Sequence, residues 1–135
     1  MKSRVIVAAV IEKDGKILLG RKKPGVGPYP DTWHLPGGGV NLGEETIDEA
    51  ILREVKEETG LEVYKLERIV FDEDFEPDKH GEKTHYVFLV YNMRAKSLEV
   101  IAGDDLIELK WFFKSDLNSL PLPRPLIKQI KEGLL

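Results

Sequence analysis

The sequence predicts an α/β domain built on a mixed β-sheet, and three observations carry this prediction. Runs of β-branched or alternating apolar residues, typical of strands, recur along the chain. Two helical stretches lie among and after these runs, a combination typical of the α/β class. The chain has 135 residues, 41% of them apolar, with no internal repeat or linker-like segment. We therefore expect one compact domain over residues 1–135.

The first third of the chain is predicted to contain three strands. Residues 4–11, RVIVAAVI, form a nearly continuous β-branched run that is typical of a strand buried on both faces. The Asp-Gly pair at 14–15 favours a hairpin turn, so residues 16–21 are expected to return as a second strand. Prolines and glycines between 22 and 31 indicate an irregular loop, and residues 33–35 are predicted to form a short strand.

The rest of the chain is predicted to hold two helices and four strands. A helix from about 46 to 59 begins near Thr46 or Glu45, because such residues satisfy free amides at a helix start. Gly60 supplies its end. The other predicted elements are strands at 61–71, 85–94, 97–101 and 106–113, a polar loop at 76–84 and a final helix at 126–135.

Composition excludes several classes of protein. No apolar run approaches the roughly 20 residues that span a bilayer, so we predict no membrane segment. The formal net charge of -4 argues against a nonspecific nucleic-acid binder, although it permits a small anionic ligand in a local basic pocket. The absence of cysteine rules out disulfides and thiolate metal sites, and it suits the reducing cytoplasm, where we expect the protein to work.

The predicted helix at 46–59 has an inward face that begins apolar and ends acidic. At about 100° per residue, Glu54 and Glu58 fall within the apolar arc and Glu57 lies at its edge, whereas Arg53 is expected on the solvent side. The residues that define the arc are Ile47, Ala50, Ile51 and Val55. An ordinary solvated run of charge does not place its acids on the core face.

A bound cation explains this placement better than a structural ion-pair cluster does. Carboxylates spaced i,i+4 repel, anions near a helix C-terminus oppose the helix dipole, and an unpaired buried charge is costly. A divalent cation removes all three penalties together. Glutamate oxygens favour hard ions, so the sequence predicts Mg²⁺ or Mn²⁺ at this face.

The segment at 38–61, GGVNLGEETIDEAILREVKEETGL, resembles the signature of the Nudix hydrolases, G-x5-E-x7-R-E-U-x-E-E-x-G-U with U aliphatic. The chain fills every specified position, with Gly39, Glu45, Arg53, Glu54, Val55, Glu57, Glu58, Gly60 and Leu61. The resemblance implies a Nudix-type α/β/α sandwich. It also implies hydrolysis of the diphosphate linkage in a nucleoside diphosphate derivative.

The resemblance also implies roles for the site residues. Glu54, Glu57 and Glu58 would hold the metal ions, and one of them, which the resemblance does not assign, would act as general base. Arg53 and Glu45 would form a pair that orients the loop and the helix.

The glycine whose carbonyl would meet the metal is ambiguous, because the loop before the helix has one residue more than the usual family spacing. Alignment on Pro36 assigns this role to Gly37, and alignment on the signature assigns it to Gly38. We favour Gly37, because the segment WHLPG fixes the end of the preceding strand and a loop absorbs the extra residue.

The remaining candidates lie outside the signature. The predicted substrate-binding residues are Lys22, Arg21, Trp33 and His85, for each of which a purely structural role is the alternative. A further acidic metal ligand is common in the family, and the candidates here are Asp104, Asp105 and Glu108.

The resemblance leaves the substrate open. The compact chain is similar to members that cleave nucleoside triphosphates, including damaged nucleotides, to the monophosphate. An ADP-ribose pyrophosphatase is the alternative, since fifteen residues separate Pro77 from the end of the signature, a spacing seen in that subgroup. A non-catalytic nucleotide sensor is less consistent with an intact signature. The expected partner is a small nucleotide, and a homodimer is common among similar proteins.

Overall fold

The computed structural model describes residues 1–26, 29–103 and 105–133, and describes residues 69 and 70 by their backbone alone. Within this part of the chain the strands form a six-stranded mixed sheet in the order β4-β5-β1-β2-β6, with β3 paired to β1. β1 runs parallel to β5, and the other pairs are antiparallel. The elements are β1 (Lys2–Lys13), β2 (Lys16–Lys22), β3 (Gly37–Gly39), α1 (Ile47–Thr59), β4 (Val63–Pro77), β5 (Lys83–Ala95), β6 (Leu106–Phe113), the 3-10 turn η1 (Lys114–Ser119) and α2 (Arg124–Lys131).

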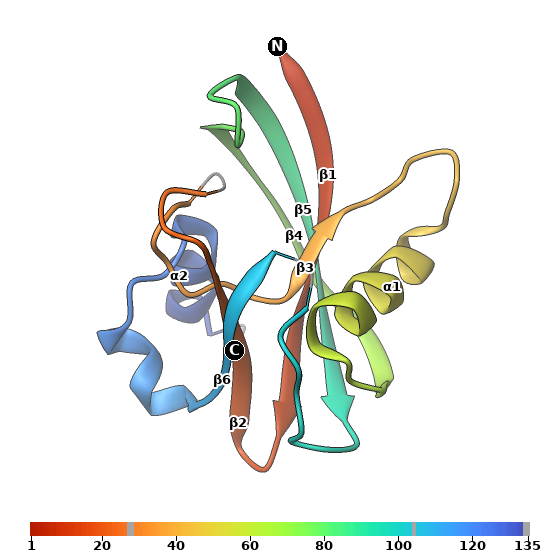
Figure 1. Ribbon diagram of the computed structural model, residues 1–135, viewed down its shortest axis with the longest axis vertical. Coiled ribbons are helices and arrows are strands. Elements are labelled where there is room, and N and C mark those ends of the chain that lie inside the picture. The colour runs from red at the N-terminus through yellow and green to blue at the C-terminus, as the bar shows by residue number, and fades with distance from the viewer. Residues whose placement is uncertain (27–28, 104, 134–135) are drawn as a thin grey trace.

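The two helices cover opposite sides of the sheet (Figure 1). Val7 and Ile11 of β1 point toward α1, where they pack with Ile51 and Val55 in one fully buried cluster. Val10, one residue out of phase, joins a second cluster on the α2 side. Because successive strand residues face opposite ways, the β-branched run at the N-terminus supplies both cores. The predicted α/β/α sandwich is confirmed.

Several predicted elements are present with altered ends. The turn at 14–15 joins β1 to β2, with φ of 52° at Asp14 and 75° at Gly15. β4 and β5 are longer than predicted, and only residues 78–82 remain as loop. The Asp78 carboxylate shortens this loop, since it accepts hydrogen bonds from the amides of His80 and Glu82 at 2.8 and 2.9 Å. α2 begins at Arg124 rather than 126, because proline is tolerated in the first helical turn.

Two predicted strands are wrong. Residues 33–35 form only an isolated bridge, between His34 and Gly20, and the strand that follows consists of the glycines of β3. Residues 97–101 are not a strand, because the chain instead packs against the end of α1. There the amides of Ile101 and Gly103 donate to the carbonyls of Thr59 and Glu58 at 3.1 and 3.0 Å, which satisfies carbonyls that a helix end leaves free.

No helix in the described part of the chain has both the length and the apolar character needed to cross a membrane.

Candidate active site

The start and end of α1 fix the rotation of its acidic face. Thr46 and Glu49 form a capping box, in which each side chain accepts from the other residue's amide at 3.1 and 2.9 Å. Gly60 ends the helix with φ of 73°, and its amide donates to the Lys56 carbonyl. The helix predicted from the sequence is confirmed, and these two ends hold its inward face against the sheet.

The glutamates of α1 meet the glycine strand β3. Glu54 and Glu58 are buried, at 8% and 2% exposure. The Gly37 N–H donates to Glu58 Oε1 at 2.8 Å. A Cβ atom on Gly38 would lie 2.5 Å from Glu54 Oε2, so only glycine leaves room for that carboxylate. The Glu57 side chain lies at the rim of this face and is 48% exposed.

Arg53 lies over the acidic face instead of pointing into solvent, which corrects the expectation from helical periodicity. Its guanidinium donates twice to Glu45, from Nε at 2.8 Å and from Nη2 at 2.7 Å. Nη1 lies 2.9 Å from Glu54 and 3.3 Å from Glu57, and Nη2 also donates to the Gly39 carbonyl at 3.2 Å. One arginine therefore joins the loop, β3 and two acids of α1.

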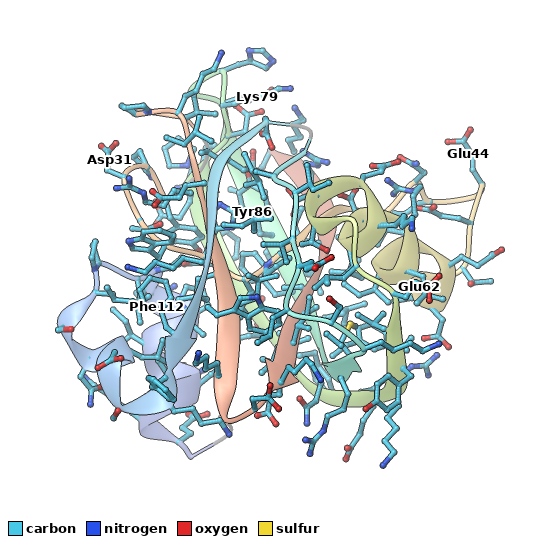
Figure 2. The ribbon with its side chains drawn as sticks, turned by 60° about the horizontal axis from the view of Figure 1, so that its bottom comes forward. Asp31, Glu44, Glu62, Lys79, Tyr86 and Phe112 are labelled. Atoms are coloured by element: carbon cyan, nitrogen blue, oxygen red, sulfur yellow. The ribbon has the colours of Figure 1, made fainter. Side chains whose placement is uncertain are left out.

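Glu45 and not Glu44 takes part in this arrangement. The hydrogen bonds from Arg53, followed by one from the Asn41 amide, lower the pKa of Glu45 to about 2. Glu44 is exposed and lies on the outer part of the loop before α1, away from the sheet (Figure 2). The extra loop residue is absorbed by a turn that includes Gly43, whose φ is 84°.

The register of β3 decides which glycine carbonyl faces α1. The Ala9 amide donates to the Pro36 carbonyl at 2.8 Å, and two residues further along each strand Val7 pairs with Gly38. In an antiparallel pair only alternate residues exchange hydrogen bonds with the partner strand. The peptide groups of Gly38 therefore point toward β1, and those of Gly37 point away from it, to the side where Glu58 lies.

Burial raises the pKa of Glu58 from 4.5 to about 8. The Gly37 amide and the positive charge of Lys22 oppose this rise, and the negative charge of Glu54 adds to it. Without a cation, the Glu58 carboxyl is therefore mostly protonated at neutral pH. A cation bound at this face would displace that proton.

We predict that this proton makes the stability of the metal-free protein depend on pH. Between pH 4.5 and 8 Glu58 is ionised in the unfolded chain and protonated in the folded one, so the free energy of unfolding falls as pH rises, by on the order of a few kcal/mol. Urea denaturation in the presence of a chelator, at a series of pH values, measures this slope. Glu58→Gln should flatten it, and an unchanged slope in that variant would contradict the assignment.

The acids do not form a ready-made cation cage. Among the described residues no three His, Cys, Asp or Glu side chains converge closely enough to hold a metal ion. The contacts already described explain this, since Arg53 engages the carboxylates of Glu54 and Glu57 while the Gly37 amide engages Glu58. The donor set itself, three carboxylates and a backbone carbonyl, has the oxygen chemistry that hard divalent ions require.

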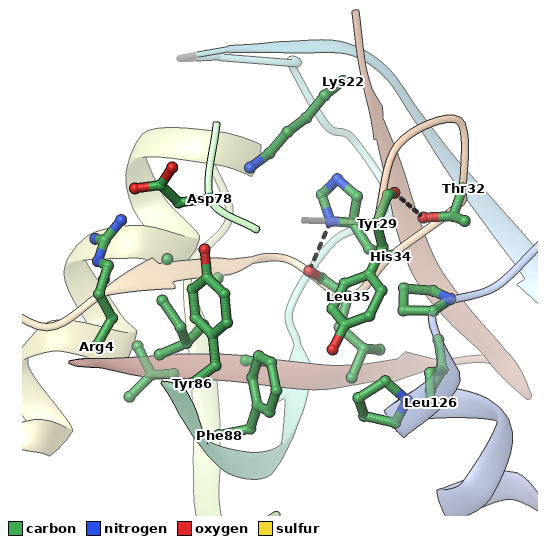
Figure 3. Close-up of a pocket in the computed structure, with 18 of the residues that line it drawn as sticks. Arg4, Lys22, Tyr29, Thr32, His34, Leu35, Asp78, Tyr86, Phe88 and Leu126 are labelled. Carbon is green, nitrogen blue, oxygen red and sulfur yellow. Dashed lines mark hydrogen bonds between the residues drawn. The ribbon is translucent and has the colours of Figure 1, made fainter. Parts of the chain in front are cut away.

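A cavity of about 280 Å³ opens beside β3, on the face of the sheet opposite the one that α1 covers (Figure 3). Tyr86 and Phe88 of β5 line it, and so do the glycines of β3. Lys22 and His34 stand on its wall. His34 Nδ1 lies 3.0 Å from the Leu35 carbonyl, which can only accept, so Nδ1 carries the proton. Burial lowers the pKa of His34 and leaves Nε2 as a neutral acceptor.

The structure brings only part of the predicted substrate side to this cavity. Lys22 lines it and lies 3.6 Å from Asp105, which also lines it. Arg21 instead pairs with Glu108 at 2.7 Å and stacks over Trp33, a core residue, at 4.7 Å. Asp104 lies outside the described residues.

His85 lies on the other face of β5. Its ring stacks on Phe75 at 4.3 Å, and Nε2 lies 2.8 Å from a carboxylate oxygen of Glu73. The aromatic residues that do face the cavity, Tyr86 and Phe88, are one and three positions further along the strand. Strand alternation was the signal that could have separated them, since adjacent side chains point to opposite faces.

The chain is similar to several known proteins. Residues 1–132 match the family profile described as NUDIX domain. An ADP-ribose pyrophosphatase of Methanocaldococcus jannaschii is 40% identical over 119 residues, which cover 87% of this chain but only 64% of that protein. The nucleoside triphosphatase NudI of an Enterobacter species is 30% identical over 128 residues, 90% of each chain. A crystal structure of a MutT NUDIX hydrolase from Burkholderia pseudomallei superposes with a TM-score of 0.77, 31% identity and 93% coverage of both chains. Together with the intact signature on α1, these matches establish that the chain belongs to the Nudix hydrolase family.

Proposed function

We propose that the chain hydrolyses the diphosphate linkage of a nucleoside diphosphate derivative, giving a nucleoside monophosphate and a phosphorylated product, with Mg²⁺ or Mn²⁺ as cofactor. One observation carries the proposal. The buried carboxylates of Glu54 and Glu58 face the β3 glycines, which also line the cavity. A diphosphate is a polyanion, so its binding beside these acids requires cations between them.

We propose that Glu54, Glu57, Glu58 and the Gly37 carbonyl hold the metal. The register of β3 favours Gly37 over Gly38, whose peptide groups point toward β1. When bound, the metal ions would neutralise phosphate oxygens and activate a water molecule. Asp105 is the candidate for a further ligand, because it lines the cavity, whereas Glu108 is paired with Arg21.

The other residues position this centre. Arg53 holds Glu45, the Gly39 carbonyl and Glu54 together, so it fixes the distance between α1 and β3. Lys22 places an ammonium group on the cavity wall near Glu58, where it can contact a phosphate oxygen. Loss of the Glu58 proton when the cation binds would then leave the carboxylate free to act as a ligand or as a base.

Two substrate classes are proposed. ADP-ribose comes first, because the relative with 40% identity is named as an ADP-ribose pyrophosphatase. This reverses the order from the sequence alone, which placed nucleoside triphosphates first. Nucleoside triphosphates come second, because the NudI relatives, at 30% or 31% identity, match over 86% to 90% of their own length.

A substrate panel tests the proposal. Purified protein is assayed on ADP-ribose, nucleoside triphosphates, dinucleoside polyphosphates and sugar nucleotides, with Mg²⁺, with Mn²⁺ and with chelator. Turnover that requires a divalent ion is expected, and ¹⁸O-labelled water will identify the phosphorus that is attacked. If no substrate in the panel shows metal-dependent turnover, the proposed hydrolase activity is refuted.

We predict that Arg53→Lys lowers kcat/KM by about 10- to 100-fold, the usual effect of losing an orienting partner of a metal site. Lysine cannot reproduce the two parallel bonds from Arg53 to Glu45. Steady-state kinetics at a series of Mg²⁺ concentrations should also show that the variant needs more Mg²⁺ than wild type to reach half of its maximal rate. Arg68→Lys is the matched control, since Arg68 forms a similar but exposed pair with Asp48 at 3.0 Å. Equal losses in both variants would contradict the role of Arg53.

We also propose a cytoplasmic location, supported by a sequence without cysteine. A homodimer remains a proposal, for which sedimentation of the purified protein is the direct measurement.

A further inference from the structure

Arg4 of β1 carries a positive charge that no side chain in the described part of the chain neutralises. It is exposed, it lines the cavity, and it forms no ion pair or hydrogen bond with any residue that the structure describes. Every other arginine pairs with a carboxylate, namely Arg21, Arg53, Arg68, Arg94 and Arg124. An accessible guanidinium on a cavity wall without a protein partner is available to an anionic ligand.

The Arg4 guanidinium lies against the last residue of β3. A Cβ atom on Gly39 would lie 2.0 Å from Arg4 Nη2, so the arginine occupies the space of the missing side chain. Both residues line the cavity. Gly39 is two residues from Gly37, the proposed metal ligand. The unmatched charge is therefore close to the place where the diphosphate is proposed to react.

The register of β1 and β5 shows how the lining of the cavity changes along its length. From the start of β1, the paired residues that line it are Arg4 and Tyr86, then Ile6 and Phe88, then Ala8 and Val90. Val90 packs with Leu126 of α2 in the second core cluster. Figure 3 shows Arg4, Tyr86 and Asp78 together on one side of the cavity and Leu126 on the other. The lining is thus charged near Arg4 and apolar four residues further along β1.

The acid on the charged side does not compensate Arg4. The Asp78 carboxylate is occupied by Lys2, whose Nζ lies 2.8 Å away, and by the amides of His80 and Glu82. Only 4% of the Asp78 side chain is exposed. Lys79, next to Asp78 in the same loop, also lines the cavity and adds a further positive charge.

We propose that Arg4 binds the phosphate of the leaving group, the part of the substrate beyond the attacked phosphorus. A guanidinium presents parallel N–H donors that match two oxygens of a phosphate. With the nucleoside toward the apolar lining, the diphosphate passes the β3 glycines and its far phosphoryl group reaches Arg4. That group belongs to pyrophosphate when a triphosphate is cleaved and to ribose 5-phosphate when ADP-ribose is cleaved. This inference rests on the proposed hydrolysis and names the residue that holds the released group.

Binding of the separate products tests the inference without any turnover. Inorganic pyrophosphate, ribose 5-phosphate and AMP are titrated in Mg²⁺ into wild type and Arg4→Gln, by calorimetry or NMR. We expect the substitution to weaken pyrophosphate and ribose 5-phosphate about tenfold each, the usual effect of losing a hydrogen bond to a charged group. AMP, the other product, should change by less than about twofold.

Two further variants separate this role from a general effect of charge. Arg4→Lys keeps the charge but not the planar fork, so it should recover only part of the loss. Arg94→Gln removes an arginine that pairs loosely with Glu12, at 3.9 Å, and should change none of the three affinities. Tm of Arg4→Gln should equal that of wild type, because Arg4 has no partner among the described residues.

Two results would overturn the inference. One is an unchanged affinity for pyrophosphate and ribose 5-phosphate in Arg4→Gln, and the other is an equal loss for AMP, which would indicate only a change in the overall field. Binding of pyrophosphate through Arg4 in a protein that hydrolyses no substrate of the panel would refute the proposed activity and leave the anion site standing.

Discussion

Replacement of Glu57 by glutamine is expected to lower kcat/KM by at least about 10³-fold and to leave the fold intact. A metal ion contributes several kcal/mol of charge stabilisation in the transition state, and about 4 kcal/mol corresponds to a thousandfold in rate. The Glu57 side chain is 48% exposed and pairs with Arg53 at 3.3 Å. Its loss therefore has little effect on packing, and the change in rate reports on the chemistry.

The measurement combines initial rates over a range of Mg²⁺ concentrations with urea denaturation of the same preparations. Glu62→Gln is the control, because Glu62 is an exposed glutamate just beyond the same helix and pairs only loosely with Lys96, at 3.7 Å. That variant should keep full activity. A Glu57→Gln enzyme within tenfold of wild type would remove Glu57 from the proposed metal site.

The helix that carries the glutamates could be predicted because its signals are local. A capping threonine, a 3.6-residue apolar period and a terminal glycine all lie within fifteen residues of one another. The burial of Glu54 and Glu58 follows from the same periodicity. The position of Arg53 does not, because a long side chain leaves its own sector of the helix when partners on another segment attract it. Those partners, Glu45 and the Gly39 carbonyl, become neighbours only in the folded chain.

The substrate side was predicted less well, because its residues come from separate elements. The chemistry of His85 predicts a role in substrate binding, but the pairing of β4 and β5 decides which face a side chain occupies, and a shift of one residue exchanges the faces.

The strand β3 shows how tertiary contact overrides local preference. Glycine is unfavourable in a strand interior, and the sequence predicts no strand at 37–39. The glycines there form a strand because other groups occupy the space of their missing side chains. A Cβ atom on Gly37 would lie 2.0 Å from the Val7 carbonyl oxygen, and one on Gly38 would lie 2.5 Å from the Glu54 carboxylate.

These two clashes predict opposite outcomes for alanine at neighbouring positions. Gly37→Ala strikes backbone, which cannot move without breaking the β1–β3 pairing, so we expect a loss of at least about 3 kcal/mol in the free energy of unfolding. Gly38→Ala strikes the end of a flexible side chain. Glu54 can rotate away, so stability should fall by no more than about 1 kcal/mol while activity falls at least about 100-fold.

Urea denaturation and kcat/KM, measured on both variants, give four numbers that test this contrast. If β3 only closes the core, the two substitutions should lower stability alike, and activity should follow stability. If the Gly38 position instead reserves space for a catalytic carboxylate, Gly38→Ala should be folded, inactive and weaker in metal binding by calorimetry. In that case Gly37 is required because β1 and β3 pack too closely for a side chain, and Gly38 is required because the Glu54 carboxylate occupies the space of one. Identical residues in one short strand are then required for different physical reasons.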